Sequence, residues 1–94
     1  MRERESAVER RLRQGVLRAG GLCWKFVSPG MSGVPDRIVV TPRGEVWFVE
    51  LKAEDGRLSP RQAMILQQLK DRGANAVVLI GRDDVDRFLE VMTK

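Results

Sequence analysis

The sequence predicts an α/β fold in which helices flank a mixed four-stranded β-sheet, in the order helix, three strands, helix, strand, helix. Residues 33–52 contain two segments rich in β-branched and aromatic side chains, separated by a Pro-Arg-Gly turn at residues 42–44, as in a β-hairpin. Residues 4–19 and 59–72 have the apolar spacing of amphipathic helices. The apolar run at residues 76–80 follows the second helix, so a helical crossover would pair it in parallel with the hairpin.

Length and charge narrow the class of protein. The 94 residues suffice for a single domain, residues 1–94, with one hydrophobic core. Seventeen Lys and Arg against thirteen Asp and Glu give a net charge of +4, which suits a polyanionic partner. The chain contains no apolar run of membrane-spanning length and no apolar signal core near its start. We therefore expect a cytoplasmic protein without a membrane partner.

The rare residue types exclude several kinds of chemistry. The chain has no histidine, which excludes histidine-ligated metal sites and histidine-based nucleophilic catalysis. Its single cysteine, Cys23, excludes a zinc knuckle or an intramolecular disulfide and is expected to be a buried thiol. Metal chemistry would then depend on carboxylates, which favour a hard divalent cation.

The first helix, over about residues 4–19, has an apolar stripe and ends at a Gly-Gly pair. Its opposite face is basic, and its arginines could contact a phosphate backbone or simply be solvated. A short strand at residues 22–27 leads into a loop at residues 28–33 whose glycines and proline provide turn geometry. Ser28 and Ser32 in this loop could donate hydrogen bonds to a phosphate.

Three charged residues, Asp36, Glu50 and Lys52, occupy one end of the predicted hairpin of residues 38–41 and 45–51. Two carboxylates beside a lysine are what a metal-dependent phosphodiesterase requires. Mg²⁺ prefers oxygen ligands, and a lysine can orient the attacking water or stabilise the transition state. The alternative is an ion pair that closes the end of the sheet.

The register of the hairpin decides whether these carboxylates can meet. If the turn centres on Arg43 and Gly44, Asp36 lies opposite Leu51 and on the other face from Glu50. Bringing Asp36 and Glu50 together then requires a one-residue bulge or a longer loop, and we predict such an irregularity.

The second half of the chain supplies two further helices. Ser59 is expected to cap the first of them with Pro60 at its first position, and Gly73 is expected to end it. Ala63, Leu66, Leu69 and Lys70 set its period, with Met64 and Ile65 widening the apolar face. The last helix is predicted at residues 83–93, with Asp83 and Asp84 as cap and dipole partners rather than metal ligands. Its inward side chains are expected to be Val85, Phe88, Leu89 and Met92.

The motifs resemble a known nuclease family. Pro35-Asp36, thirteen intervening residues and Glu50-Leu51-Lys52 resemble the PD-(D/E)xK nuclease signature. The signature is extended by the segments GVPDR at residues 33–37 and LSPRQ at residues 58–62. With these additions the whole chain resembles the virus-type replication-repair nuclease (VRR-NUC) domain in its minimal, phage-like form. The segment SAVER at residues 6–10 also resembles the first helix of archaeal-type Holliday junction resolvases.

The resemblance implies a PD-(D/E)xK restriction-endonuclease-like core, αβββαβα, and a Mg²⁺- or Mn²⁺-dependent DNA endonuclease that leaves 5′-phosphate ends. Asp36 and Glu50 would be metal ligands, with the Leu51 carbonyl as a possible third. Lys52 would orient the attacking water and Gln62 would support it by holding a water or a phosphate.

The resemblance also implies one further metal ligand, a glutamate of the first helix. The match to the resolvase helix assigns it to Glu9, directly or through water, whereas helical spacing alone mildly favours Glu5. Glu5 therefore remains open as the alternative.

The substrate implied is branched DNA, with four-way junctions cut symmetrically by a homodimer. A nicking or flap endonuclease and a catalytically inactive DNA-binding subunit are the alternatives. The side chains expected to contact DNA are Arg10, Arg13, Ser28, Ser32 and Arg37.

Overall fold

The computed structural model describes residues 5–93 and confirms the predicted order of elements. None of the helices in this range has the length and apolar character needed to cross a membrane. The elements are α1 (Ala7–Arg18), β1 (Leu22–Lys25), β2 (Arg37–Val40), β3 (Val46–Lys52), α2 (Pro60–Asp71), β4 (Asn75–Ile80) and α3 (Gly81–Met92).

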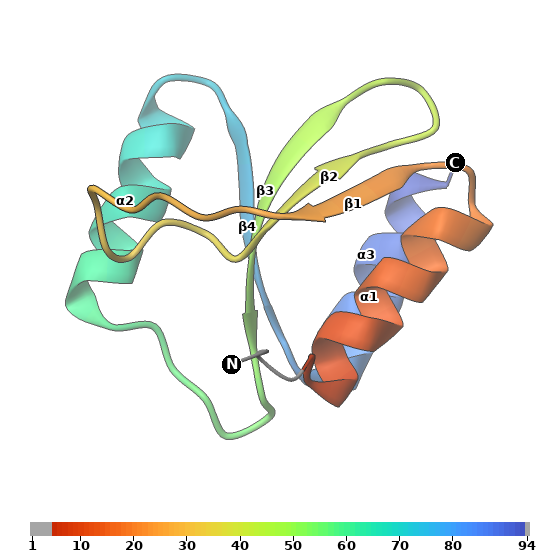
Figure 1. Cartoon of the computed structure of the whole chain (residues 1–94), viewed down its shortest axis with the longest axis horizontal. Helices are drawn as coiled ribbons and strands as arrows, with labels where there is room; N and C mark the ends of the chain where they lie inside the picture. The colour runs from red at the N-terminus through yellow and green to blue at the C-terminus, as the bar shows by residue number, and fades with distance from the viewer. Residues whose placement is uncertain (1–4, 94) are drawn as a thin grey trace.

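The four strands form one mixed sheet in the order β1-β2-β3-β4. The pairs β1-β2 and β2-β3 are antiparallel, and β3-β4 is parallel, as the helical crossover predicted. Helices α1 and α3 lie together on one face of the sheet and α2 lies on the other (Figure 1). The predicted α/β sandwich is therefore confirmed.

The main hydrophobic core lies between the sheet and the α1–α3 layer. The predicted stripe of α1 is confirmed, since Leu12 and Val16 are fully buried there. Trp47 packs edge-on against Phe88 of α3, with ring centroids 5.5 Å apart. The other members of this core include Cys23, Val39, Val49, Leu51, Leu79, Val85 and Met92.

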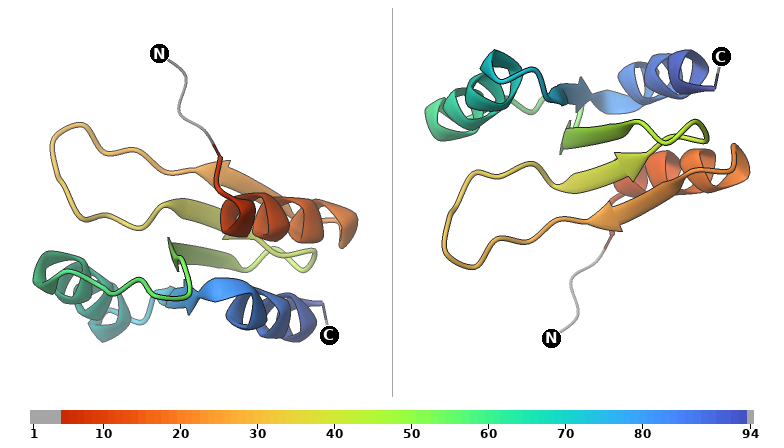
Figure 2. Two further views of the ribbon diagram at one scale, coloured as in Figure 1. Left: turned by 90° about the horizontal axis from the view of Figure 1, so that it is seen from below. Right: turned by 90° about the horizontal axis from the view of Figure 1, so that it is seen from above.

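Helix α2 covers the other face with a narrower apolar surface than predicted. Ile65 and Leu66 are buried, whereas Ala63 and Met64 are exposed, so these two were wrongly assigned to the inward face. The long loop between β1 and β2 extends along α2 (Figures 1 and 2), where Arg61 Nε donates a hydrogen bond to the carbonyl oxygen of Ser32 at 2.9 Å. The β1–β2 loop and α2 thus lie together on the face of the sheet opposite α1 and α3.

The start of α3 differs from the prediction. The helix begins at Gly81 rather than at Asp83, because Gly81 adopts a positive φ of 76° that turns the chain directly out of β4. A side chain at that position would also collide with Glu54. Asp84, in the first turn, accepts a hydrogen bond from the amide of the N-cap residue Ile80 at 2.8 Å and so stabilises the start of the helix. Asp83 is therefore not the cap.

The β2-β3 hairpin contains the predicted irregularity in its loop. Three residues separate Thr41 from Glu45, whose carbonyl accepts the Thr41 amide at 2.8 Å, and Gly44 has a φ of 90°. Arg37 consequently pairs with Val49. A turn centred on Arg43 and Gly44 would instead pair Arg37 with Glu50, so the observed register differs by one residue. Continued by one step, this register places Asp36 opposite Glu50, and opposed residues in a sheet share a face.

Candidate active site

Asp36, Glu50 and Lys52 come together at the end of β3, on the side of the sheet that α2 covers. Glu50 is only 2% exposed, and Lys52 Nζ lies 3.5 Å from its Oε2 atom. Asp36 directly precedes β2, and its Oδ2 atom accepts a hydrogen bond from the Leu51 amide at 2.9 Å. The hairpin thus holds two carboxylates and an ammonium group in one place.

The environment of Glu50 is unfavourable for a bare carboxylate. Burial raises the pKa of Glu50 from its ordinary value of 4.5 to about 7, and the nearby charge of Asp36 adds to the increase. Lys52 acts in the opposite direction, through its charge and a hydrogen bond. A buried acid with a raised pKa beside a second acid is typical of functional sites.

Gln62 of α2 connects this site to the helix beside it. Its Nε2 atom donates to Glu50 Oε2 at 3.1 Å, while its Oε1 atom accepts from the Ser59 amide at 2.9 Å. The second contact completes a capping box at the start of α2, where Ser59 and Pro60 stand as predicted. Gln62 was expected to hold a water or a phosphate; its observed partner is Glu50 itself.

We expect Gln62→Ala to lower both stability and activity. Two hydrogen bonds are lost, which costs about 1–2 kcal/mol of unfolding free energy, and release of Glu50 should reduce the predicted metal affinity and cleavage roughly 10- to 100-fold. Thermal unfolding and single-turnover cleavage measure the two effects. Gln68→Ala, an exposed site on the same helix, is the matched control. Equal activity in the two variants would contradict the connecting role of Gln62.

Glu9 lies at the edge of the site without joining the carboxylate pair. It lines a small cavity of about 90 Å³ together with Asp36 and side chains of the β1 end. Its Oε2 atom accepts a hydrogen bond from the Ser6 amide at 3.0 Å, and its own amide donates to Ser6 Oγ at 3.1 Å. Within residues 5–93, no group of three or more acidic, histidine or cysteine side chains is arranged to hold a metal.

The observed role of Glu9 is therefore a capping box with Ser6 at the start of α1. The pattern Ser-x-x-Glu before an apolar stripe is a recognised sign of such a box and was readable from the sequence. Metal ligation by Glu9 remains a prediction, and the cavity shared with Asp36 favours ligation through water.

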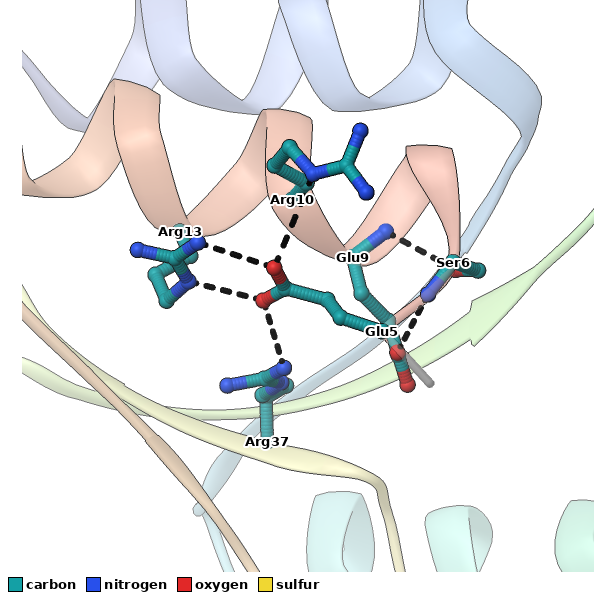
Figure 3. Close-up of polar contacts among 6 residues, drawn as sticks. All are labelled: Glu5, Ser6, Glu9, Arg10, Arg13 and Arg37. Carbon is teal, nitrogen blue, oxygen red and sulfur yellow. Dashed lines mark hydrogen bonds and ion pairs between the residues drawn. The ribbon is translucent and has the colours of Figure 1, made fainter. Parts of the chain in front are cut away.

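Glu5 is bound by arginines instead. It accepts two hydrogen bonds from Arg13, at 2.7 and 2.8 Å, and one from Arg37 at 3.1 Å (Figure 3). The hydrogen bond from Arg13, together with the surrounding arginine charges, lowers the pKa of Glu5 to about 2. A carboxylate held in this way is a poor candidate for the metal ligand that helical spacing favoured.

The residues expected to contact DNA divide by exposure. Arg37 is only 4% exposed and pairs with Glu5 on the α1 side of the sheet, so it is poorly placed for the predicted DNA contact. Arg13 is half-buried in the pair with Glu5, whereas the side chain of Arg10 is 54% exposed. Ser28 is half-buried and Ser32 exposed in the loop beside α2. Arg61, which anchors that loop, was missed although it lies in the LSPRQ segment.

The oxygen atoms at the site fit a hard divalent cation. Asp36 and Glu50 supply two adjacent carboxylates, and Mg²⁺ commonly takes one or two carboxylates and completes its shell with water and phosphate oxygens. Burial is the main cause of the raised pKa of Glu50, and a dication would offset both that burial cost and the added repulsion from Asp36. The Leu51 carbonyl stays a predicted third ligand.

Comparison with known proteins places the chain in a family. The family model described as VRR-NUC domain matches residues 2–83. A protein of Acyrthosiphon pisum secondary endosymbiont phage 1, described as a candidate nuclease, p44, is 41% identical over 80 residues, which cover 85% of this chain and 86% of that protein. A solved VRR-NUC domain matches with a TM-score of 0.81 and 36% identity over 88% of this chain and 90% of its own.

A more distant structure shares the fold. Hjc, a Holliday junction resolvase from the archaeal hyperthermophile Archaeoglobus fulgidus, matches with a TM-score of 0.58 and 22% identity. The match covers 79% of this chain and 65% of the resolvase. With a family match over most of its length, this chain belongs to the VRR-NUC domain family.

Proposed function

We propose that this protein is a Mg²⁺- or Mn²⁺-dependent DNA endonuclease that prefers four-way junctions. The observation that carries the proposal is the placement of Asp36 beside the buried Glu50, with Lys52 Nζ 3.5 Å from the latter. Membership of the VRR-NUC family, and the candidate nuclease among its relatives, support nuclease activity.

The residues have distinct roles in this proposal. Asp36 and Glu50 would hold the cation, assisted by the Leu51 carbonyl and by Glu9 through water. The bound cation supplies charge neutralisation at the phosphate and lowers the pKa of a bound water. Lys52 would orient the attacking water, and Gln62, whose Nε2 atom donates to Glu50, would hold that carboxylate in place. The exposed Arg10 and the loop serines would contact the phosphate backbone beside the cut.

The junction preference rests on the resemblance of residues 6–10 to the resolvase first helix and on symmetry. Two symmetric cuts need two active sites, which a two-fold homodimer provides. The exposed apolar side chains Leu22, Trp24 and Val46 lie on one face of the sheet, because Leu22 pairs with Val40, which pairs with Val46. Such a patch is typical of interaction surfaces and is consistent with the proposed dimer.

The test compares labelled DNAs of equal length as a four-way junction, a flap, a nicked duplex and a plain duplex, each with Mg²⁺ or Mn²⁺. We expect paired symmetric cuts in the junction with 5′-phosphate ends, and a dimer by sedimentation at the assay concentration. Cleavage of flaps or nicked duplex alone would support nuclease activity but would contradict the preference for four-way junctions. Tight binding to all four DNAs without cutting would indicate an inactive DNA-binding subunit and overturn the proposal.

A further inference from the structure

Glu5 joins two segments that are far apart in the sequence. Its carboxylate lies between Arg13 of α1 and Arg37 of β2, with the Arg10 Nε atom 3.9 Å away (Figure 3). Both oxygens are engaged by Arg13, and Oε2 is shared with Arg37. One anionic group thus fixes the start of α1 to the start of β2.

This pairing has a high structural cost. Arg37 is 4% exposed, and its Nε atom has no hydrogen-bond partner among the described residues. A buried guanidinium is tolerated only when an anion compensates it, and removal of the anion leaves an unpaired buried charge. The pKa of Glu5 is lowered to about 2, so the carboxylate stays ionised throughout the pH range of ordinary enzyme assays. An ion pair with a buried arginine is weak evidence for stability, which raises the question of what else the pair provides.

Glu5 and its partner Arg37 are each close in sequence to a residue of the candidate site. Arg37 follows Asp36 directly, and the two side chains point to opposite faces of the sheet. Asp36 is held from its own side by the Leu51 amide, and its carbonyl accepts from the Phe26 amide at 2.8 Å. At the other end, Glu5 directly precedes Ser6, which forms the capping box with Glu9.

We infer that Glu5 is a positioning residue of the nuclease: it holds Asp36 and Glu9 in register with each other through Arg37 and Arg13, without contacting metal or DNA. The inference rests on the proposed function, because it concerns the same site. It explains why Asp36 and Glu9 line one cavity although they come from different layers of the fold.

The first test compares Glu5→Gln with Glu45→Gln, which makes the same charge change at an exposed residue of the hairpin. We expect Glu5→Gln to cut DNA roughly 10- to 100-fold more slowly and to bind Mn²⁺ more weakly. Its affinity for DNA without divalent ions should not fall, because the net charge rises by one. Unchanged cleavage and Mn²⁺ affinity, relative to Glu45→Gln, would overturn the inference.

A second variant separates positioning from stability. Glu5→Gln combined with Arg37→Met removes both charges of the pair, so that no buried guanidinium is left unpaired and the unfolding midpoint should recover relative to Glu5→Gln alone. Positioning predicts that cleavage and Mn²⁺ affinity stay low in this double variant. Recovery of both to the level of the unsubstituted protein would show a purely structural pair.

The outcomes distinguish this inference from the proposed function. If the unsubstituted protein binds Mn²⁺ but cuts no DNA, the proposed function fails, and the Mn²⁺ affinities of the variants still decide the role of Glu5. If the unsubstituted protein binds no Mn²⁺, both are overturned.

Discussion

Replacement of Lys52 by alanine is expected to abolish nearly all cleavage while leaving DNA binding largely intact. Removing a positioned donor that stabilises developing charge typically costs about 100- to 1000-fold in rate. A second loss acts through Glu50, because Lys52 holds the pKa of that buried acid down. Without the ammonium group, Glu50 keeps its proton to a higher pH. The cleavage rate of the variant should therefore begin to increase at a higher pH than the rate of the unsubstituted protein.

Single-turnover rates across pH, with DNA affinity measured without divalent ions, check this expectation. Lys70→Ala, which removes the same charge from an exposed site in the last turn of α2, is the control. A loss of DNA affinity matching the loss of rate would place Lys52 in general electrostatic binding rather than in the chemistry. A rate close to that of Lys70→Ala would remove Lys52 from the site.

Glu50→Gln is expected to give an inactive protein that is more stable than the original at alkaline pH. The pKa of Glu50 is about 7 in the folded protein against an ordinary value of 4.5, so folding favours its protonated form. The carboxyl group does not oppose folding below pH 4.5; its cost grows as the pH rises from 4.5 to 7 and levels off above pH 7. At one pKa unit per 1.36 kcal/mol, the difference of 2.5 units corresponds to a cost on the order of 3 kcal/mol above pH 8.

Urea unfolding at several pH values measures this cost. The glutamine variant should gain stability over the original protein between pH 5 and 8 and lose that gain in acid. Mg²⁺ should raise the unfolding midpoint of the original protein and not that of the variant, because a ligand stabilises only the form that binds it. Glu45→Gln, at an exposed position, should show neither effect. A glutamine variant that is equally or less stable at pH 8 would contradict the assignment of Glu50 as a strained, buried acid.

The elements that position the site were predictable from local patterns. The apolar residues on both faces of β3 indicated a strand buried on two sides, with Glu50 inside it, and the Ser-Pro start of α2 placed Gln62 in the first helical turn. The hairpin register was less accessible, because a Pro-Arg-Gly turn permits loops of different length and one residue decides the face of Asp36. The need for Asp36 and Glu50 to meet led to the correct expectation of an extra residue.

The contacts of Glu5 with Arg13 and Arg37 could not be predicted from the sequence. Strand alternation indicates that Arg37 points away from Asp36, but no local pattern reveals that its partner is Glu5, 32 positions earlier in the chain. Helical spacing favoured Glu5 as the inward-facing glutamate, but Glu5 precedes the start of α1 at Ala7, and spacing could not show that arginines would neutralise it. The motif match assigned Glu9 to the metal, although the spacing of Glu9 from Ser6 also indicated a capping box.

The most direct measurement is cleavage of a labelled four-way junction by the unsubstituted protein and by Asp36→Asn, with Mg²⁺ and with a chelator in its place. The site described here predicts cleavage with 5′-phosphate ends by the unsubstituted protein with Mg²⁺, and none in the other three combinations. Cutting that persists in the chelator or in Asp36→Asn would contradict a metal-dependent nuclease built on Asp36 and Glu50.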